Sequence, residues 1–335
     1  MVFIKKLKVV SLFSGIGALE SGLHRLNVDY DLVGFSEIDK PAINTYCAIH
    51  NIDKSKNLGD VTKINANDLP DFDLLMHGSP CQSFSFIGQQ EGGDEGSETK
   101  SSLMWNTVDI VRAKKPKYVI WENVKAVVSP KNVHNLEKYI ETLDGLGYKS
   151  FYKVVNSRDF NVAQNRERLF VVSIVDGTEY NFPEPIELTK TIRDYIDEIV
   201  DDKYIVPKQV MMGYKNKKSI FKKRFRLREL DEYAYCLTAK SGRAVITNNY
   251  IYNDLEMYSN KPCENNDLDY MADNDISVRS LTPEEYWRLQ CFSPEEFAIA
   301  KEITSDAQLY KQAGNSITVD VIEGILKNLL HEWLV

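Results

Sequence analysis

The chain has 335 residues, of which 43% are hydrophobic and 27% are charged, and its formal net charge is −8. This composition is that of an ordinary soluble globular protein, and no run approaches the roughly 18 apolar residues of a membrane span. The N-terminus has no signal-peptide core, so we expect a cytoplasmic protein without a membrane partner. The five cysteines form no Cys-x-x-Cys pair and the five histidines have no metal-ligand spacing, so neither a disulfide framework nor a metal site is expected.

Residues 8–175 alternate between short β-rich runs and helix-like stretches. This alternation predicts an α/β fold with a doubly wound, mainly parallel sheet, Rossmann-like in class. The expected strands are residues 9–13, 31–35, 72–76, 118–121, 151–155 and 169–175, and the expected helices are residues 18–26, 41–50, 103–113 and 136–146.

The regular pattern is lost near residue 182 and returns near residue 281. The stretch between is rich in Tyr, Asn and Lys, which predicts a smaller irregular domain at 182–280 and a larger domain formed by 1–181 and 281–335. Thr282, Pro283 and Glu285 have the order of an N-cap, a first-turn proline and a capping box. The final apolar stretch, 317–330, has helical spacing and is expected to pack on the larger domain.

Two acidic residues and a glycine-rich turn suggest a nucleotide-type ligand. The turn 13–17 (Phe-Ser-Gly-Ile-Gly) lies between a strand and a helix, where glycines admit a ligand and backbone N–H groups are free. Glu37 follows about 20 residues later, where dinucleotide-type folds bind ribose hydroxyls. Asp60 could accept a hydrogen bond from an adenine amino group. Taken singly, a plain tight turn, a solvated Glu37 and a helix-capping Asp60 explain these residues as well.

Cys81 follows an apolar strand and lies directly after Pro80. A nucleophile at the carboxyl end of a parallel strand is located where open α/β sheets bind ligands, although a lone cysteine is more often a buried structural residue. Glu122 ends the next apolar strand, where desolvation would favour its protonated form. Arg166 and Arg168 occupy alternate positions at a strand entrance, so their side chains would point the same way and could hold an anion or a base edge. The alternative is a surface ion-pair cluster.

The order of these motifs resembles that of the C5-cytosine DNA methyltransferases found in bacteria and their phages. No single motif is decisive, and the resemblance spans nearly the whole chain except about 182–278. The matching pieces are residues 13–17, Glu37, 59–62, 79–85, 122–124, 164–168, 279–285 and 312–316. Two positions depart from the usual pattern: Ser11 stands where many members have Asp, and Ile38 stands where many have Trp.

The resemblance implies transfer of a methyl group from S-adenosylmethionine to C5 of a cytosine in a specific short duplex DNA sequence. The target base would be flipped out of the duplex so that side chains can reach its ring. The Cys81 thiolate would attack C6, because C5 alone is too poor a nucleophile. Glu122 would hold or protonate N3, Arg166 would bind O2 with Arg168 in support, and loss of the C5 proton would expel Cys81.

The resemblance also implies the binding residues. Those for the cofactor are Phe13, Gly15, Gly17, Glu37, Ile38, Asp60, Gly78, Pro80, Asn315 and Ser316. Those for DNA are Gln82, Ser83, Ser85, Lys222, Lys223, Arg224, Arg226, Thr238 and Arg243. The stretch 203–228 contains ten Lys or Arg and no Asp or Glu, which favours phosphate contact in a chain that is acidic overall. The protein is expected to act as a monomer, and any companion restriction endonuclease is expected to form no stable complex with it.

Two alternatives stay open from the sequence. One is an RNA (tRNA) cytosine-C5 methyltransferase of the same fold, which the long basic domain disfavours. The other is a non-catalytic DNA-binding regulator, against which Cys81, Glu122 and Arg166 argue. The recognised DNA sequence is not apparent from the residues.

Overall fold

The computed structural model describes residues 6–80, 93–97, 99–207, 227–239, 249–253 and 276–334. The chain forms two compact units. The first comprises Met1–Asn156, Glu167–Pro185 and Val319–Val335, and the second comprises Ser157–Arg166 and Ile186–Thr318. Residues 281–318, which the sequence grouped with the larger domain, therefore lie in the second unit. A buried ion pair there, from Arg279 to Glu285, joins the start of this stretch to the irregular part of the chain.

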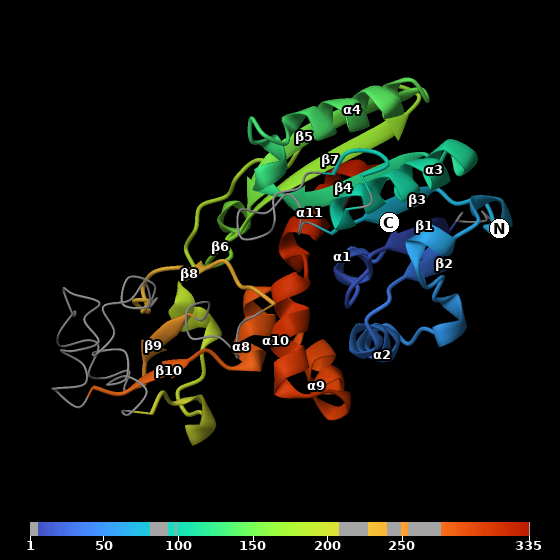
Figure 1. The fold of residues 1–335 in the computed structure, drawn as a ribbon. Helices are drawn as coiled ribbons and strands as arrows, with labels where there is room; N and C mark the ends of the chain where they lie inside the picture. The colour runs from blue at the N-terminus through green and yellow to red at the C-terminus, as the bar shows by residue number, and fades with distance from the viewer. Residues whose placement is uncertain are drawn as a thin grey trace. The chain divides into compact units, whose positions relative to one another are not determined.

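The first unit is built on a six-stranded sheet with the order β2-β1-β3-β4-β7-β5 (Figure 1). Its strands are β1 (Leu7–Leu12), β2 (Tyr30–Ser36), β3 (Leu74–His77), β4 (Tyr118–Val124), β5 (Tyr148–Asn156) and β7 (Glu167–Val175). Strands β1 to β4 pair in parallel, and β7 is antiparallel to both of its neighbours. The segment between β5 and β7 contains no crossover helix. Antiparallel neighbours need none, because the chain can turn back directly from one strand to the next. The predicted mainly parallel α/β fold is confirmed.

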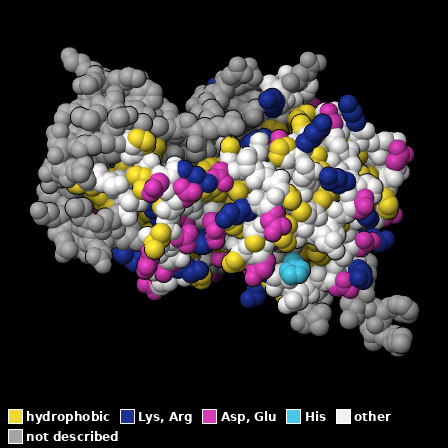
Figure 2. Space-filling view, turned by 90° about the horizontal axis from the view of Figure 1, so that it is seen from below, with side chains coloured by type: hydrophobic (Ala, Val, Ile, Leu, Met, Phe, Trp, Pro, Cys, Tyr) yellow, Lys and Arg dark blue, Asp and Glu magenta, His cyan; other side chains and the backbone are white. Residues whose placement is uncertain are grey.

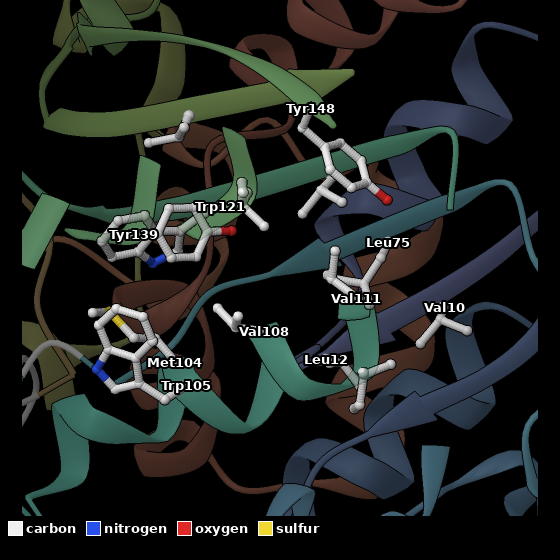
Figure 3. Packing of buried hydrophobic residues seen from close by; sticks show 14 of the residues in the cluster. Val10, Leu12, Leu75, Met104, Trp105, Val108, Val111, Trp121, Tyr139 and Tyr148 are labelled. Atoms are coloured by element: carbon white, nitrogen blue, oxygen red, sulfur yellow. The ribbon is translucent and has the colours of Figure 1, made fainter. Parts of the chain in front are cut away.

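Helices cover both faces of this sheet because the strand order extends in two directions from its centre. The helices are α1 (Ala18–Arg25), α2 (Lys40–Ile49), α3 (Met104–Lys114), α4 (Val133–Asp144) and α11 (Val319–Leu329). Right-handed crossovers toward β2 and toward β4 place their helices on opposite faces. Figure 3 shows one of these faces, where Val108 and Val111 of α3 and Tyr139 of α4 pack with Leu75 and Trp121 of the sheet.

The final helix packs in the first unit, as the helical spacing of the last stretch predicts. A Cβ added to Gly22 of α1 would lie 3.3 Å from side-chain atoms of both Ile322 and Leu326 in α11. The two helices are therefore in direct contact, and Gly22 permits the close approach. None of the helices in the described part of the chain is long and apolar enough to cross a membrane.

Within its described residues, the second unit contains short strands and three helices. The pairs are β6 (Gln164–Asn165) with β8 (Ala234–Tyr235), in parallel, and β9 (Tyr250–Tyr252) with β10 (Val278–Ser280), antiparallel. The helices are α8 (Pro283–Leu289), α9 (Pro294–Ile303) and α10 (Asp306–Asn315). The expected capping box at the start of α8 is present, and α9 begins with a second capping box, formed by Ser293 and Glu296. Figure 2 shows basic and acidic side chains interspersed over the described part of the face that it presents.

The described residues also form short 3₁₀ helices. In the first unit they lie at Lys54–Lys56, Val61–Lys63, Ala66–Asp68, Lys100–Leu103, Lys125–Val128 and His331–Trp333, and in the second unit at Ser157–Phe160, Ile192–Tyr195 and Asp202–Tyr204.

Candidate active site

The backbone that leads into Cys81 is fixed by side chains of neighbouring elements. Strand β3 ends at His77, and the following Ser79 is buried. Trp121 Nε1 donates to Ser79 Oγ at 3.0 Å, and Asn123 Nδ2 donates to the Ser79 carbonyl oxygen at 3.0 Å. Ser101 Oγ donates to the carbonyl oxygen of Pro80 at 2.9 Å. The peptide groups on the N-terminal side of Cys81 are therefore held from β4 and from the start of the α3 region.

Glu122 and Arg168 form an ion pair across β4 and β7. Arg168 Nε lies 3.2 Å from Glu122 Oε1, and the two side chains are only 18% and 13% exposed. Arg168 Nη1 also donates to its neighbour's carbonyl oxygen, on Glu167, at 2.8 Å. A Cβ added to Gly78 would lie 3.4 Å from Glu122 Oε2. The carboxylate, the guanidinium and the backbone three residues before Cys81 thus meet at one edge of the sheet.

Arg166 has a different environment from Arg168. It belongs to the second unit, it is 3% exposed, and its Nη1 donates to the Leu237 carbonyl oxygen at 3.0 Å. Its Nη2 donates to the carbonyl oxygens of Gly314 at 3.2 Å and of Ser316 at 2.5 Å. Arg166 stands between the end of β6 and the start of β7, so the strand alternation that would align it with Arg168 does not extend through this position. The two arginines have separate partners.

The glycine-rich turn after β1 is tied to the end of β2 by Glu37. Gly15 N donates to Glu37 Oε2 at 3.0 Å, and Glu37 Oε1 accepts from the backbone N–H groups of Ile38 at 2.8 Å and Asp39 at 2.9 Å. Phe13, Gly15 and Gly17 all have positive φ, at 54°, 57° and 86°. A Cβ added to Gly15 would have no atom within 4 Å, so the turn faces open space at Gly15. This geometry leaves room for a ligand against the backbone.

Two residues that the sequence motifs did not single out support this turn. His50 Nε2 lies 3.0 Å from the Ile16 carbonyl oxygen, which only accepts, so Nε2 carries the proton in this contact. A Cβ on Gly17 would lie 2.1 Å from the same nitrogen. Asn57 Oδ1 accepts from the N–H groups of Glu37 at 3.2 Å and Gly59 at 3.0 Å, which joins the two acidic motifs. No periodicity marks either residue, although Asn57 lies two residues before Gly59 of the Gly59-Asp60 motif.

Ile38 and Asp60 lie in the two segments that contain Glu37 and Asn57, and both offer groups that a nucleoside could contact. Ile38, next to Glu37 in the sequence, is 74% exposed and presents apolar surface to solvent. Asp60 Oδ1 accepts from Thr62 N at 3.0 Å and from Thr62 Oγ1 at 2.9 Å, and these hydrogen bonds lower the pKa of Asp60. Asp60 therefore caps the 3₁₀ helix at Val61–Lys63, as its simpler interpretation predicts. Its other carboxylate oxygen has no role in that cap, and the carboxylates, exposed apolar surface and open glycine turn suit a nucleoside.

The remaining described candidates lie in the second unit. Asn315 ends α10 and is exposed, while Ser316 is buried and its carbonyl oxygen accepts from Arg166. The backbone of Thr238 lies against Gly314. Nine candidates fall outside the described residues: Cys81, Gln82, Ser83, Ser85, Lys222, Lys223, Arg224, Arg226 and Arg243.

His77 is a core residue beneath the candidate site. Its Nε2 lies 3.0 Å from Tyr139 Oη, and its ring lies nearly parallel to that of Trp121. Complete burial lowers the pKa of His77 to about 3, so the ring is neutral at physiological pH. Among the described residues, no group of three or more His, Cys, Asp or Glu side chains could hold a metal ion.

Comparisons with known proteins give a consistent result. A family model described as C-5 cytosine-specific DNA methylase matches residues 7–331. The chain is 30% identical over 440 aligned positions to the orphan methyltransferase M.SPBetaI of Bacillus phage SPbeta, covering 99% of each sequence. It is 33% identical over 325 positions to the type II methyltransferase M.NlaX of Neisseria lactamica, covering 96% of each.

Solved structures resemble the chain in fold. The Dnmt2 methyltransferase of S. pombe superposes with a TM-score of 0.76 at 21% identity and covers 98% of this chain and 99% of its own. A structure described as a putative DNA modification methyltransferase encoded within a prophage of E. coli superposes with a TM-score of 0.65 at 18% identity, covering 97% and 99%. At these identities the likeness concerns the fold.

Proposed function

Since the chain belongs to the family of C-5 cytosine-specific DNA methylases and is a DNA (cytosine-5-)-methyltransferase, we propose its reaction in finer terms. It transfers the methyl group of S-adenosylmethionine to C5 of one cytosine in a specific short duplex sequence, through a covalent bond from Cys81 to C6 of a flipped base. The observation that carries this proposal is the Glu122–Arg168 pair, which lies beside Gly78 in the approach to Cys81.

The first steps of the proposed reaction use Cys81 and Glu122. The Cys81 thiolate adds to C6, which breaks the C5–C6 double bond and raises the electron density at C5. Glu122 hydrogen-bonds or protonates N3, which limits the negative charge that the ring acquires. After methyl transfer, loss of the C5 proton restores the double bond and expels the Cys81 thiolate. Extrusion of the base precedes these steps because C6 is inaccessible inside a stacked duplex.

We assign the contact with the cytosine O2 to Arg168 in place of Arg166. Arg168 pairs with Glu122, and N3 and O2 are adjacent atoms of cytosine, so a paired carboxylate and guanidinium can meet both. The contacts of Arg166 argue for another role, because its guanidinium donates to three backbone carbonyl oxygens in the second unit. Arg166 is thus proposed to organise that unit.

The cofactor residues are supported by the open turn and its acidic neighbours. Glu37 is proposed to bind the ribose, Asp60 the adenine amino group, and Ile38 one face of the adenine ring. The glycine turn 13–17, Gly78, Pro80, Asn315 and Ser316 are proposed as further contacts. When bound, S-adenosylmethionine supplies an electrophilic methyl group and leaves as S-adenosylhomocysteine. The chain's own groups fix the turn before binding, since Glu37 already bridges Gly15 and the end of β2.

Binding of duplex DNA is proposed for the region 182–280. The basic stretch 203–228 would contact phosphates, and Thr238 and Arg243 would read bases. Gln82, Ser83 and Ser85, which follow Cys81, would lie along the DNA. We also propose that one chain acts alone and that any companion restriction endonuclease forms no stable complex with it.

The test is bisulfite sequencing of DNA from cells that lack cytosine methylation and express either the wild-type chain or a Cys81→Ala control. Protection of one short motif only with the wild type supports the proposal and identifies the target cytosine. Purified enzyme is then offered duplex DNA and tRNA with labelled S-adenosylmethionine. Labelling of tRNA alone would exclude the DNA substrate, and labelling of DNA without a covalent complex on 5-fluorocytosine DNA would exclude the Cys81 mechanism.

A further inference from the structure

Residues 237–239 of the second unit are held by two buried side chains from the segment before β7. Gln164 Oε1 accepts from Leu237 N at 3.2 Å, and Arg166 Nη1 donates to the Leu237 carbonyl oxygen at 3.0 Å. The backbone N–H and C=O groups of Leu237 are therefore both hydrogen-bonded to side chains that are almost completely buried. The chain can move at Leu237 only if these hydrogen bonds break.

A second constraint acts on the next peptide. A Cβ added to Gly314 would lie 2.1 Å from the Thr238 carbonyl carbon and 2.3 Å from Ala239 N. These are backbone atoms, so no rotation of a side chain relieves the overlap. Any residue other than glycine at 314 would displace either the Thr238–Ala239 peptide or the end of α10.

The two constraints belong to one buried hydrogen-bonded network. Gln164 Nε2 donates to the Leu289 carbonyl oxygen at 2.8 Å, and Gln290 Nε2 donates to the Ala313 carbonyl oxygen at 2.6 Å. Thr318 Oγ1 donates to Gln290 Oε1 at 2.9 Å. Buried hydrogen-bond networks of this kind make the core rigid and favour a single arrangement. The ends of α8 and α10 are thereby locked to the segment that carries Thr238.

We propose that Gln164 and Gly314 are specificity-positioning residues, which fix the backbone so that Thr238 meets base edges in one geometry. This inference rests on the proposed function, in which the second unit recognises DNA. Base readout depends on side chains held within about 0.5 Å of their productive position, whereas long basic side chains adapt their phosphate contacts. A shift of the Thr238 peptide therefore lowers discrimination between sequences more than it lowers the rate at the cognate site.

The test compares Gly314→Ala and Gln164→Leu with the wild type and with Tyr310→Phe. Tyr310 Oη donates to the Leu281 carbonyl oxygen at 2.6 Å, so Tyr310→Phe also removes a buried hydrogen bond of the second unit, away from residues 237–239. The target sequence is first found with the wild type, and methylation rates are then measured on the cognate duplex and on each single-base variant of it. All assays are run below the lowest melting temperature of the set.

The expected result is a fall of about tenfold in the cognate-to-variant rate ratio for Gly314→Ala and for Gln164→Leu, at one or more positions of the site. Tyr310→Phe should keep the wild-type ratio. Equal slowing on all sequences by Gly314→Ala and Gln164→Leu, or an equal loss of ratio in Tyr310→Phe, would overturn the inference. A wild-type enzyme that methylates no duplex at all would instead reject the proposed function, before any variant is compared.

Discussion

Arg168 Nε lies 3.2 Å from Glu122 Oε1, and the two residues come from strands that are adjacent but antiparallel. The pairing depends on the reversal at β7, because only that reversal brings the beginning of β7 to the carboxyl end of β4. A guanidinium and a carboxylate from distant parts of the sequence are thus placed at the strand edge that precedes Cys81. The pair is the part of the candidate site most open to direct test.

Glu122→Gln should lower kcat by about 10²- to 10⁴-fold, because an amide cannot exchange a proton with N3. Cofactor affinity should stay near that of the wild type, since Glu122 is not among the residues assigned to S-adenosylmethionine. Single-turnover rates on duplex DNA, together with cofactor titration, measure both quantities. A loss smaller than tenfold would argue against the N3 role.

Arg166→Met and Arg168→Met should separate stability from catalysis. Loss of Arg166 removes its hydrogen bonds to three buried carbonyl oxygens and should lower the free energy of unfolding by more than about 2 kcal/mol. Loss of Arg168 should change the melting temperature less and lower kcat by about 10²-fold or more. Denaturation curves and turnover measured on both variants give the comparison, and the reverse pattern would return the O2 contact to Arg166.

Ser79→Ala should both destabilise the chain and slow turnover. It leaves the Trp121 indole N–H without its buried acceptor, at a cost of about 1–3 kcal/mol, and it loosens the backbone two residues before Cys81. Ser173→Ala is the matched control, because Ser173 is also buried in the sheet and its hydroxyl lies 2.7 Å from the hydroxyl of Ser150. That control should lose stability without a comparable loss of kcat; parallel losses in both variants would remove the positional role of Ser79.

His50→Leu should raise KM for S-adenosylmethionine by roughly three- to tenfold at nearly constant kcat, because it removes one hydrogen bond that holds the glycine turn. His50→Gln keeps an N–H donor and should restore part of the affinity. The comparison needs initial rates at varied cofactor concentration with saturating DNA. Equal KM values for the two variants would show that the hydrogen bond is unimportant.

His77 should make folding stability depend on pH. Its folded pKa of about 3 lies below its usual value of 6.5, so the unfolded chain binds more protons between these values. The stability from a neutral His77 is present above pH 6.5 and is lost as the pH falls toward 3, at up to about 1.4 kcal/mol per pH unit. Urea denaturation at pH 7 and pH 5 should show a loss about 2 kcal/mol larger for the wild type than for His77→Gln. A matching loss in His77→Gln would exclude His77 as the cause.

Much of the architecture could be predicted because periodicity and capping are local properties. The six strands of the first sheet, its four early helices and the final helix are all confirmed, with ends shifted by a few residues. The capping box at Thr282 and Glu285 is also confirmed, since both partners lie within one helical turn. These elements require no knowledge of distant contacts.

Features that depend on contacts between distant residues were not predictable in the same way. Arg166 and Arg168 make different contacts because regular strand structure is interrupted at Arg166, which their alternating spacing in the sequence does not reveal. The contact of His50 with the Ile16 carbonyl oxygen joins residues 34 positions apart, so it depends on how α2 packs against the glycine turn. The placement of residues 281–318 in the second unit likewise involves contacts between distant residues, such as those of Gln164 with the Leu289 carbonyl oxygen and of Arg288 with Asp197.

The path of the chain through its two units limits how the second unit, for which we propose DNA recognition, can be exchanged between relatives. The chain leaves the first unit after Asn156, returns at Glu167, leaves again after Pro185 and returns at Val319. A graft of residues 186–318 from another enzyme would arrive without Ser157–Arg166, and therefore without its own Gln164 and Arg166. The Gln164 and Arg166 side chains of the recipient would then have to form hydrogen bonds with backbone groups of the grafted segment. Chimaeras that transfer both segments together should consequently inherit a new target sequence more often than chimaeras that transfer the longer segment alone.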